Sequence, residues 1–98
     1  MLRQIVQVKA RRDYKVYVYF DDGAIKLFDV DALIKKGGVF SKIADIEKFV
    51  ATCTVMNNTL AWDINGNFDE YNCIDIDPET IYREGQEVED PLSSTAAD

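Results

Sequence analysis

The sequence predicts a small α+β domain, with an antiparallel sheet built from two hairpins and joined to short helices. Three observations predict this class. The chain has 98 residues and 47% apolar content, which suits one domain with one modest core. Strand-like runs flank turn residues twice, within 14–28 and 51–63. Apolar residues at helical spacing lie between and after these runs. We expect one domain over residues 1–84 and a flexible acidic tail over residues 85–98.

The first strands lie near the N-terminus. Residues 4–9 alternate apolar and polar side chains, and residues 14–20 are rich in β-branched and aromatic types, which favour strands. Asp22 and Gly23 then predict a two-residue hairpin turn, because Gly accepts a positive φ. A second strand follows the turn.

A two-residue turn fixes which side chains share a face of this first hairpin. It pairs Phe20 with Ile25 on one face and Tyr17 with Phe28 on the other. Both faces are substantially apolar, so the hairpin is either covered on both sides or presents Tyr17, Tyr19 and Phe28 to a partner. Core packing is the preferred interpretation.

Two short helices are predicted in the middle of the chain. Asp31 is placed to cap a helix over residues 32–36, which the glycines at 37–38 end. Residues 41–50 carry apolar side chains at helical spacing. Asp45 is a candidate to interrupt this second helix by capping a new turn.

The second hairpin carries the only Trp. Residues 51–63 form two strands around an Asn-Asn turn at 57–58, since Asn tolerates the left-handed conformation of such turns. The pairing places Cys53 opposite Trp62 on an apolar face. We therefore expect Trp62 to anchor the core.

The last predicted elements are a strand and a helix. Residues 74–76 read as a short strand. Asp77 is placed to cap a helix with Pro78 at its first position, where the missing N–H costs nothing. Ile81 and Tyr82 would pack this helix onto the sheet.

Composition excludes several classes of function. Two Cys and no His cannot complete a four-ligand zinc site, and no Ser or Cys has a His base for nucleophilic catalysis. We expect reduced thiols at Cys53 and Cys73. No run reaches the ~18 apolar residues of a membrane span, and no apolar signal segment precedes the first strand. We expect a cytoplasmic protein.

Charge is distributed unevenly along the chain. The net charge is −7, but residues 1–15 carry a balance of +4 and residues 63–98 a balance of −10. The whole chain therefore makes a poor nucleic-acid binder. A nucleic-acid-binding regulator remains an alternative through the basic N-terminal residues, which are Arg3, Lys9, Arg11 and Arg12.

The loop from Asp63 to Glu70 has oxygen-bearing side chains at alternate positions, as calcium ligands often do. An EF-hand needs Gly at its sixth position and Glu at its twelfth, and these positions hold Phe68 and Ile74. We expect no metal or other cofactor. A metal-binding accessory or enzyme that uses this loop remains an alternative.

Several segments occur in a familiar order and spacing. They are Phe20-Asp21-Asp22-Gly23, Asp29-Val30-Asp31, Gly38-Val39-Phe40, Phe49, Leu60-Ala61-Trp62 and Asp75-Ile76-Asp77-Pro78-Glu79-Thr80-Ile81-Tyr82. Over about residues 3–84 the chain resembles the bacterial family called domain of unknown function 2442, in the subgroup with an Asp-Ile-Asn-Gly-Asn insert. The resemblance implies an α+β domain with an antiparallel sheet and no established activity. Genes of this family often lie beside another small gene, so the resemblance also implies that the protein is the antitoxin-like member of a toxin–antitoxin pair.

These observations favour a non-enzymatic interaction module. An acidic segment is complementary in charge to a basic protein, so we expect a basic partner such as a toxin-like product of a neighbouring gene. Assembly of the chain into a homo-oligomer is a further alternative. The candidate partner-binding residues are Tyr82, Glu84, Glu87, Glu89 and Asp90, with Tyr17, Tyr19 and Phe28 as a second surface.

Overall fold

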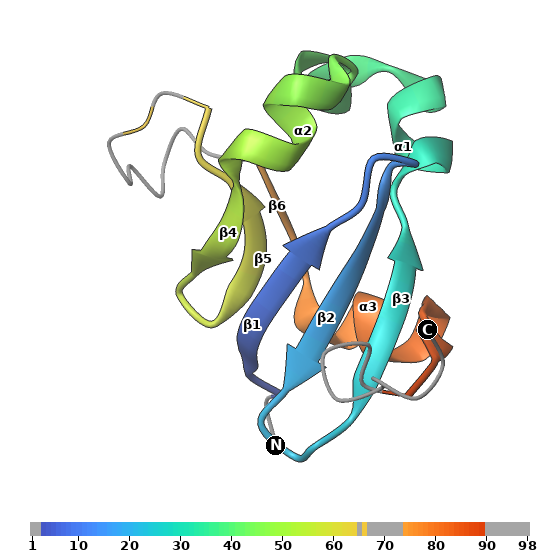
Figure 1. Ribbon diagram of the computed structural model, residues 1–98, viewed down its shortest axis with the longest axis vertical. Coiled ribbons are helices and arrows are strands. Elements are labelled where there is room, and N and C mark those ends of the chain that lie inside the picture. The colour runs from blue at the N-terminus through green and yellow to red at the C-terminus, as the bar shows by residue number, and fades with distance from the viewer. Residues whose placement is uncertain (1–2, 65, 67–73, 90–98) are drawn as a thin grey trace, which may run out of the picture.

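The computed structural model describes residues 3–64, 66 and 74–89 (Figure 1). The α+β class is confirmed, and the two predicted hairpins lie in different antiparallel sheets. The four-stranded sheet has the order β1-β2-β3-β7, and its strands are β1 (Ile5–Ala10), β2 (Lys15–Phe20), β3 (Ile25–Asp29) and β7 (Gln86–Glu87).

The three-stranded sheet has the order β4-β5-β6. Its strands are β4 (Cys53–Met56), β5 (Thr59–Trp62) and β6 (Ile74–Ile76). The predicted pairing of Cys53 with Trp62 is confirmed. Asn57 and Asn58 both have positive φ, at 52° and 60°, as a tight hairpin turn requires.

Short helices cover the ends and one face of the sheets. They are α1 (Asp31–Lys36), the 3₁₀ helix η1 (Gly38–Ile43), α2 (Ile46–Thr52) and α3 (Pro78–Glu84). In Figure 1, α1 and α2 lie at the upper end of the molecule and α3 lies behind the four-stranded sheet. No helix in the described part of the chain is long and apolar enough to cross a membrane.

The capping residues differ in part from the prediction. Asp45 does interrupt the second helical segment, since it is the N-cap of α2 and accepts a hydrogen bond from the Glu47 N–H. Asp31 does not cap α1: Val30 holds the N-cap position, and the Asp31 N–H itself donates to Asp29 Oδ1 at 2.9 Å. The carboxylate that accepts a backbone hydrogen bond before α1 is therefore that of Asp29, two residues before the predicted cap.

The turn between β2 and β3 is one residue longer than predicted. The Phe20 N–H donates to the Ala24 carbonyl, and the Gly23 N–H donates to the Phe20 carbonyl, so residues 21–23 form a three-residue loop. Gly23 has a φ of 92°, which suits the left-handed last position of such a loop. The Asp-Gly pair is therefore present, but it ends a longer turn.

This extra residue changes the pairing of the first hairpin. Tyr17 pairs with Leu27, and Val16 pairs with Phe28. The predicted pairing of Tyr17 with Phe28 is wrong, because a one-residue shift moves a side chain to the opposite face. Phe28 lies in the core with 6% of its surface exposed. Phe28 therefore packs in the core, as the preferred interpretation had it, and does not reach the alternative partner-facing surface.

β7 lies beyond the predicted domain boundary at residue 84. Gln86 pairs with Leu27 and Glu87 with Lys26. The Val88 N–H also donates to the Ile25 carbonyl at 3.0 Å. Regular structure therefore continues into the segment that we predicted as a tail, and it forms one edge of the four-stranded sheet.

One apolar core lies between the sheets and α3. Val16, Val18 and Phe20 point inward from β2, and Leu60 and Trp62 point inward from β5. The helices contribute buried side chains to the same cluster, which are Ile43, Phe49 and Ile81. Trp62 is fully buried, as predicted.

Candidate functional site

Tyr82 lies half-buried on α3, where it contacts the four-stranded sheet and the start of the chain. Its hydroxyl donates to Asp22 Oδ2 at 3.0 Å, and this hydrogen bond is the main reason that its pKa is raised. The guanidinium of Arg3 lies 3.6 Å from the ring centroid, and the ammonium of Lys26 lies 4.7 Å from it. Phe20 meets the ring edge-on at 5.0 Å. Tyr82 thus holds α3 in place, whatever further contact it makes.

Three of the predicted acidic residues lie together at the end of α3. Glu84 ends the helix, Glu87 lies in β7 and Glu89 follows it, and all three are exposed. We call this segment the acidic edge. Glu84 lies 3.1 Å from Arg83, whereas Glu87 and Glu89 form no ion pair with a residue that the structure describes. The fourth predicted residue, Asp90, lies outside the described residues.

The second predicted surface is the outer face of the four-stranded sheet. Tyr17 and Tyr19 are half-buried there, opposite Leu27 and Ile25 on β3. The Tyr17 hydroxyl accepts a hydrogen bond from Arg11 Nη1 at 3.3 Å. Two of the three predicted residues therefore share this face, and the third, as described above, is buried.

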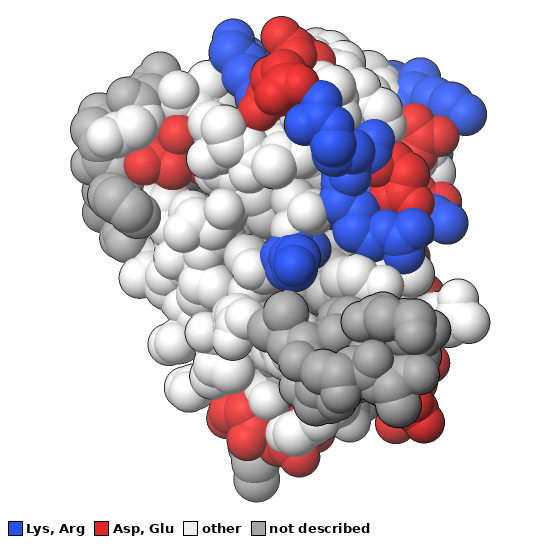
Figure 2. Space-filling view, in the orientation of Figure 1, with Lys and Arg blue, Asp and Glu red and all other residues white. Residues whose placement is uncertain are grey.

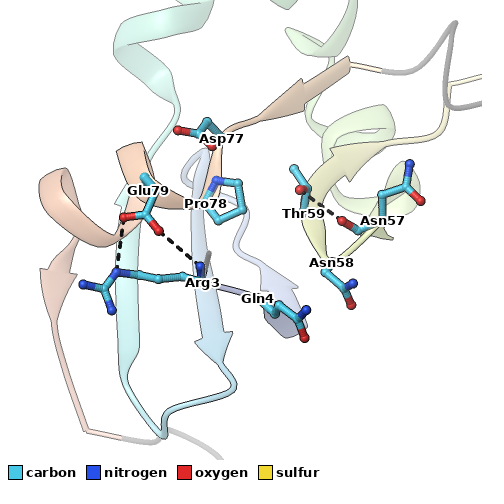
Figure 3. Close-up of a pocket in the computed structure, with 8 residues that line it drawn as sticks. All are labelled: Arg3, Gln4, Asn57, Asn58, Thr59, Asp77, Pro78 and Glu79. Carbon is cyan, nitrogen blue, oxygen red and sulfur yellow. Dashed lines mark hydrogen bonds and ion pairs between the residues drawn. The ribbon is translucent and has the colours of Figure 1, made fainter. Parts of the chain in front are cut away.

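A polar cleft opens between α3 and the β4–β5 turn (Figure 3). Its volume is about 250 Å³. The residues that line it come from the start of the chain, the β4–β5 turn and the start of α3: Arg3, Gln4, Asn57, Asn58, Thr59, Asp77, Pro78 and Glu79. Sequence reasoning missed this cleft, because its three segments are far apart in the chain.

Local structure explains how the cleft is formed. The Ile5 N–H donates to the Asn58 carbonyl at 2.9 Å, which ties the start of β1 to the β4–β5 turn. The Arg3 N–H donates to Glu79 Oε2 at 3.1 Å, which ties the same segment to α3. The residues before β1 therefore form the floor of the cleft, and Asn58 and Glu79 belong to its two walls.

The two carboxylates in the cleft have different surroundings. Glu79 faces Arg3, whose Nε lies 3.3 Å from Oε1, within ion-pair range but outside hydrogen-bond geometry. Arg3 also lies 3.7 Å from Asp22. Asp77 holds the N-cap position of α3, as predicted, but its side chain makes no capping hydrogen bond. Among the described residues, its carboxylate thus has no hydrogen-bond or ion-pair partner.

The basic residues near the N-terminus mostly have acidic partners. Arg11 lies 2.8 Å from Asp13, and Arg12 is hydrogen-bonded to Glu47, whose pKa this contact lowers. Figure 2 shows acidic side chains among the basic ones near the β1–β2 turn. Arg3 is also paired, as described above. Three of the four cations behind the nucleic-acid alternative therefore have a carboxylate nearby.

The loop considered for a metal lies mostly outside the described residues. Asp63 is buried, with 8% of its surface exposed, whereas Asn65, Asn67 and the segment 68–70 are not described. Within 3–64, 66 and 74–89, no group of three or more His, Cys, Asp or Glu side chains is placed to hold a metal ion.

The thiol of Cys53 is free and largely buried beside the β4–β5 hairpin. Burial raises its pKa from 9.0 to about 12, because the thiolate loses hydration. Such a thiol is a poor nucleophile at neutral pH. Cys73 lies outside the described residues.

Comparison with known proteins gives a family. The family model described as "Protein of unknown function (DUF2442)" matches residues 5–87. The chain matches no curated protein and no solved structure. The matched segment includes every described strand and helix, from β1 to β7. This chain therefore belongs to the DUF2442 family of proteins of unknown function.

Proposed function

We propose that this protein is a non-enzymatic interaction module that binds a basic protein in the cytoplasm, as the antitoxin-like member of a two-gene pair. The observation that carries the proposal is the acidic edge. Its three carboxylates are exposed within six residues, and two of them have no cation among the described residues. A basic surface would supply that cation.

The location of the acidic edge suits recognition. It follows α3, which Tyr82 fastens to the sheet, and it includes β7, which is hydrogen-bonded to β3. The backbone of this segment is therefore positioned before a partner arrives, which lowers the entropy that binding must overcome. The net charge of −7 adds long-range attraction for a basic protein.

The partner to test is the product of the adjacent gene. We would compare its association with the wild-type chain, with Glu87→Gln/Glu89→Gln, and with Asp21→Asn/Asp75→Asn. Both double variants remove two exposed charges, but only the first removes them from the acidic edge. We expect the edge variant to associate about 3- to 10-fold more slowly and the control to change by less than about twofold.

Salt gives a second readout. Raising the ionic strength from about 0.05 to 0.5 M should slow association of the wild type and should narrow its difference from the edge variant. If the adjacent gene product binds both double variants equally and its association rate does not change with ionic strength, the acidic edge is not the interface. If no complex forms at all, the two-gene proposal is wrong.

A further inference from the structure

We infer that the outer face of the four-stranded sheet is a docking surface for residues 90–98 of the same chain, with Leu92 packed against Tyr19. The outer face is the side of this sheet that faces away from α3. The inference goes beyond the proposed function and does not depend on it, because no partner molecule enters the argument.

The outer face has an apolar centre. Tyr17 lies opposite Leu27 across β2 and β3, and Tyr19 lies opposite Ile25. Residues opposite each other in an antiparallel pair share one face of the sheet, so these four side chains form a continuous patch, which we call the tyrosine patch. All four are half-buried. In Figure 1, α3 lies behind the sheet, and no described helix or strand lies in front of it.

Basic side chains border the tyrosine patch. Lys9 lies opposite Tyr17 in the β1–β2 pair, and Lys15 precedes Tyr17 by two residues, so both lie on the outer face. Neither lysine forms an ion pair with a residue that the structure describes. Figure 2 shows basic side chains on this side of the molecule. An acidic segment that carries an apolar residue is therefore complementary to this face.

The segment that follows the described residues has this composition. Residues 89–98 read Glu-Asp-Pro-Leu-Ser-Ser-Thr-Ala-Ala-Asp, with three acidic side chains, no basic one and a single large apolar residue, Leu92. Opposite charges favour its contact with Lys9 and Lys15. The small side chains after Leu92 allow an extended backbone to lie close to the sheet.

The chain reaches the border of the outer face just before this segment. β7 lies along the edge of β3, and the Val88 N–H donates to the Ile25 carbonyl at 3.0 Å. Pro91 has no N–H to donate to such a ladder. Four extended residues span at most about 14 Å and neighbouring strands lie about 4.8 Å apart, so Leu92 can reach Tyr19 on the next strand.

The rest of the segment is long enough to cross the sheet. The six residues from Leu92 to Asp98 span at most about 20 Å, whereas β3 and β1 are separated by two strand spacings, or about 10 Å. The acidic side chains on both sides of Leu92 can therefore lie beside the lysines of β1 and β2.

A covered outer face also accounts for the composition of the first hairpin. The inner face of the hairpin packs in the core, and its outer face carries the tyrosine patch in place of the polar side chains usual on a solvated sheet. While residues 90–98 cover the patch, a partner must bind the protein elsewhere or displace them. The acidic edge lies outside the patch and stays accessible.

The first test measures how readily a reagent reaches each tyrosine of the intact chain. Tetranitromethane nitrates accessible tyrosine rings, and peptide mass spectrometry gives the rate for each residue. Leu92→Ser should raise the nitration rate of Tyr19 about threefold or more, because it removes the apolar contact that keeps the segment on the sheet. The matched control, Ala96→Ser, introduces the same side chain in the same segment and should change this rate by less than about twofold.

Tyr82 serves as the internal reference. It lies on α3, behind the sheet, so uncovering the outer face should leave its nitration rate unchanged. An equal rise at Tyr19 and Tyr82 in Leu92→Ser would indicate a general loosening of the fold and would overturn the inference. A Tyr19 rate that is the same in the wild type and in Leu92→Ser would overturn it too.

A second measurement identifies what covers the face. In an equal mixture of ¹³C-labelled and unlabelled protein, isotope-filtered spectra separate nuclear Overhauser effects within a chain from those between chains. We expect effects between the Leu92 methyl groups and the Tyr19 ring within one chain. Effects seen only between chains would assign the face to a second copy. A Leu92 with no effect to the outer face would leave it to another molecule, and either result contradicts the inference.

Discussion

At the scale of single residues, Trp62 shows how one side chain joins two elements, β5 and α2. It is fully buried on β5, its ring centroid lies 5.5 Å from that of Phe49, and its indole N–H donates to the Phe49 carbonyl at 3.2 Å. Trp62→Ala should lower the free energy of unfolding by about 3–5 kcal/mol, because it leaves a cavity in a small core. Urea denaturation measures this change.

A second variant separates packing from the hydrogen bond. Trp62→Phe keeps an aromatic ring but loses the indole donor, so the Phe49 carbonyl loses its partner from β5. We expect a smaller loss than for alanine. A Trp62→Ala protein that unfolds at the wild-type urea midpoint would show that Trp62 is not an anchor.

Cys53 gives a prediction about reactivity and pH. Its pKa is raised from 9.0 to about 12, so the folded state favours the neutral thiol. At pH 8 the thiolate population should be about a thousandfold below that of a free thiol. In a Cys73→Ser background, iodoacetamide should modify Cys53 far more slowly in the folded protein than in urea.

The sign of the linkage follows from the same shift. Because the folded pKa is raised, the stability that Cys53 contributes is complete below about pH 9 and is lost as the pH rises toward about 12. Equal alkylation rates for folded and unfolded protein at pH 8 would contradict the burial of this thiol.

At the scale of elements, the junction between α3 and β7 depends on close approach. A Cβ at Gly85 would lie 2.7 Å from the Ile81 carbonyl oxygen and 2.9 Å from the Lys26 Cβ. The backbone of Gly85 is extended, so the need for glycine here is steric and does not come from a positive φ. This contact allows the chain to leave the helix and lie directly against β3.

We therefore expect Gly85→Ala to destabilise the fold by about 1–3 kcal/mol, the usual cost of overpacking. The matched control is Gln86→Ala, which introduces the same side chain at the next, exposed position. Thermal unfolding compares the two variants. A Gly85→Ala protein as stable as its control would mean that the junction can open without cost.

The two hairpins also show which elements a sequence can predict. The second was predicted with its pairing, because two adjacent asparagines tolerate the left-handed conformation of a tight turn, and both have positive φ in the structure. The first was predicted with the wrong register, because Asp22-Gly23 fits either a two-residue or a three-residue loop. Burial of Phe28 in the core selects the longer loop, and that is a tertiary effect.

β7 was missed for a related reason. Gln86 and Glu87 have no strand-like pattern of their own, and the free edge of β3 determines their conformation. The exposure of the acidic edge was predictable from its charge. The polar cleft was not, since it needs segments 3–4, 57–59 and 77–79 to meet.

At the scale of the whole molecule, the basic and acidic regions differ in how many of their charged side chains have an oppositely charged partner. Residues near the β1–β2 turn combine Arg11 and Arg12 with acidic partners, so the +4 balance of the first 15 residues is offset locally. The acidic side chains of α3 and β7 have fewer such partners among the described residues. The molecule therefore offers net negative charge at one region, as its proposed basic partner requires.

The pairing of β7 with β3 also has a consequence for how the protein is made. β1, β2 and β3 are complete once residue 29 has been synthesised, but the strand that borders β3 comes 57 residues later. At roughly 5–20 residues per second, the ribosome leaves the β3 edge without its neighbour for several seconds. An unpaired edge is a template for pairing with other chains. A nascent chain that stalls before Gln86 would carry this edge exposed, and crowded polysomes would be the place where it meets another copy.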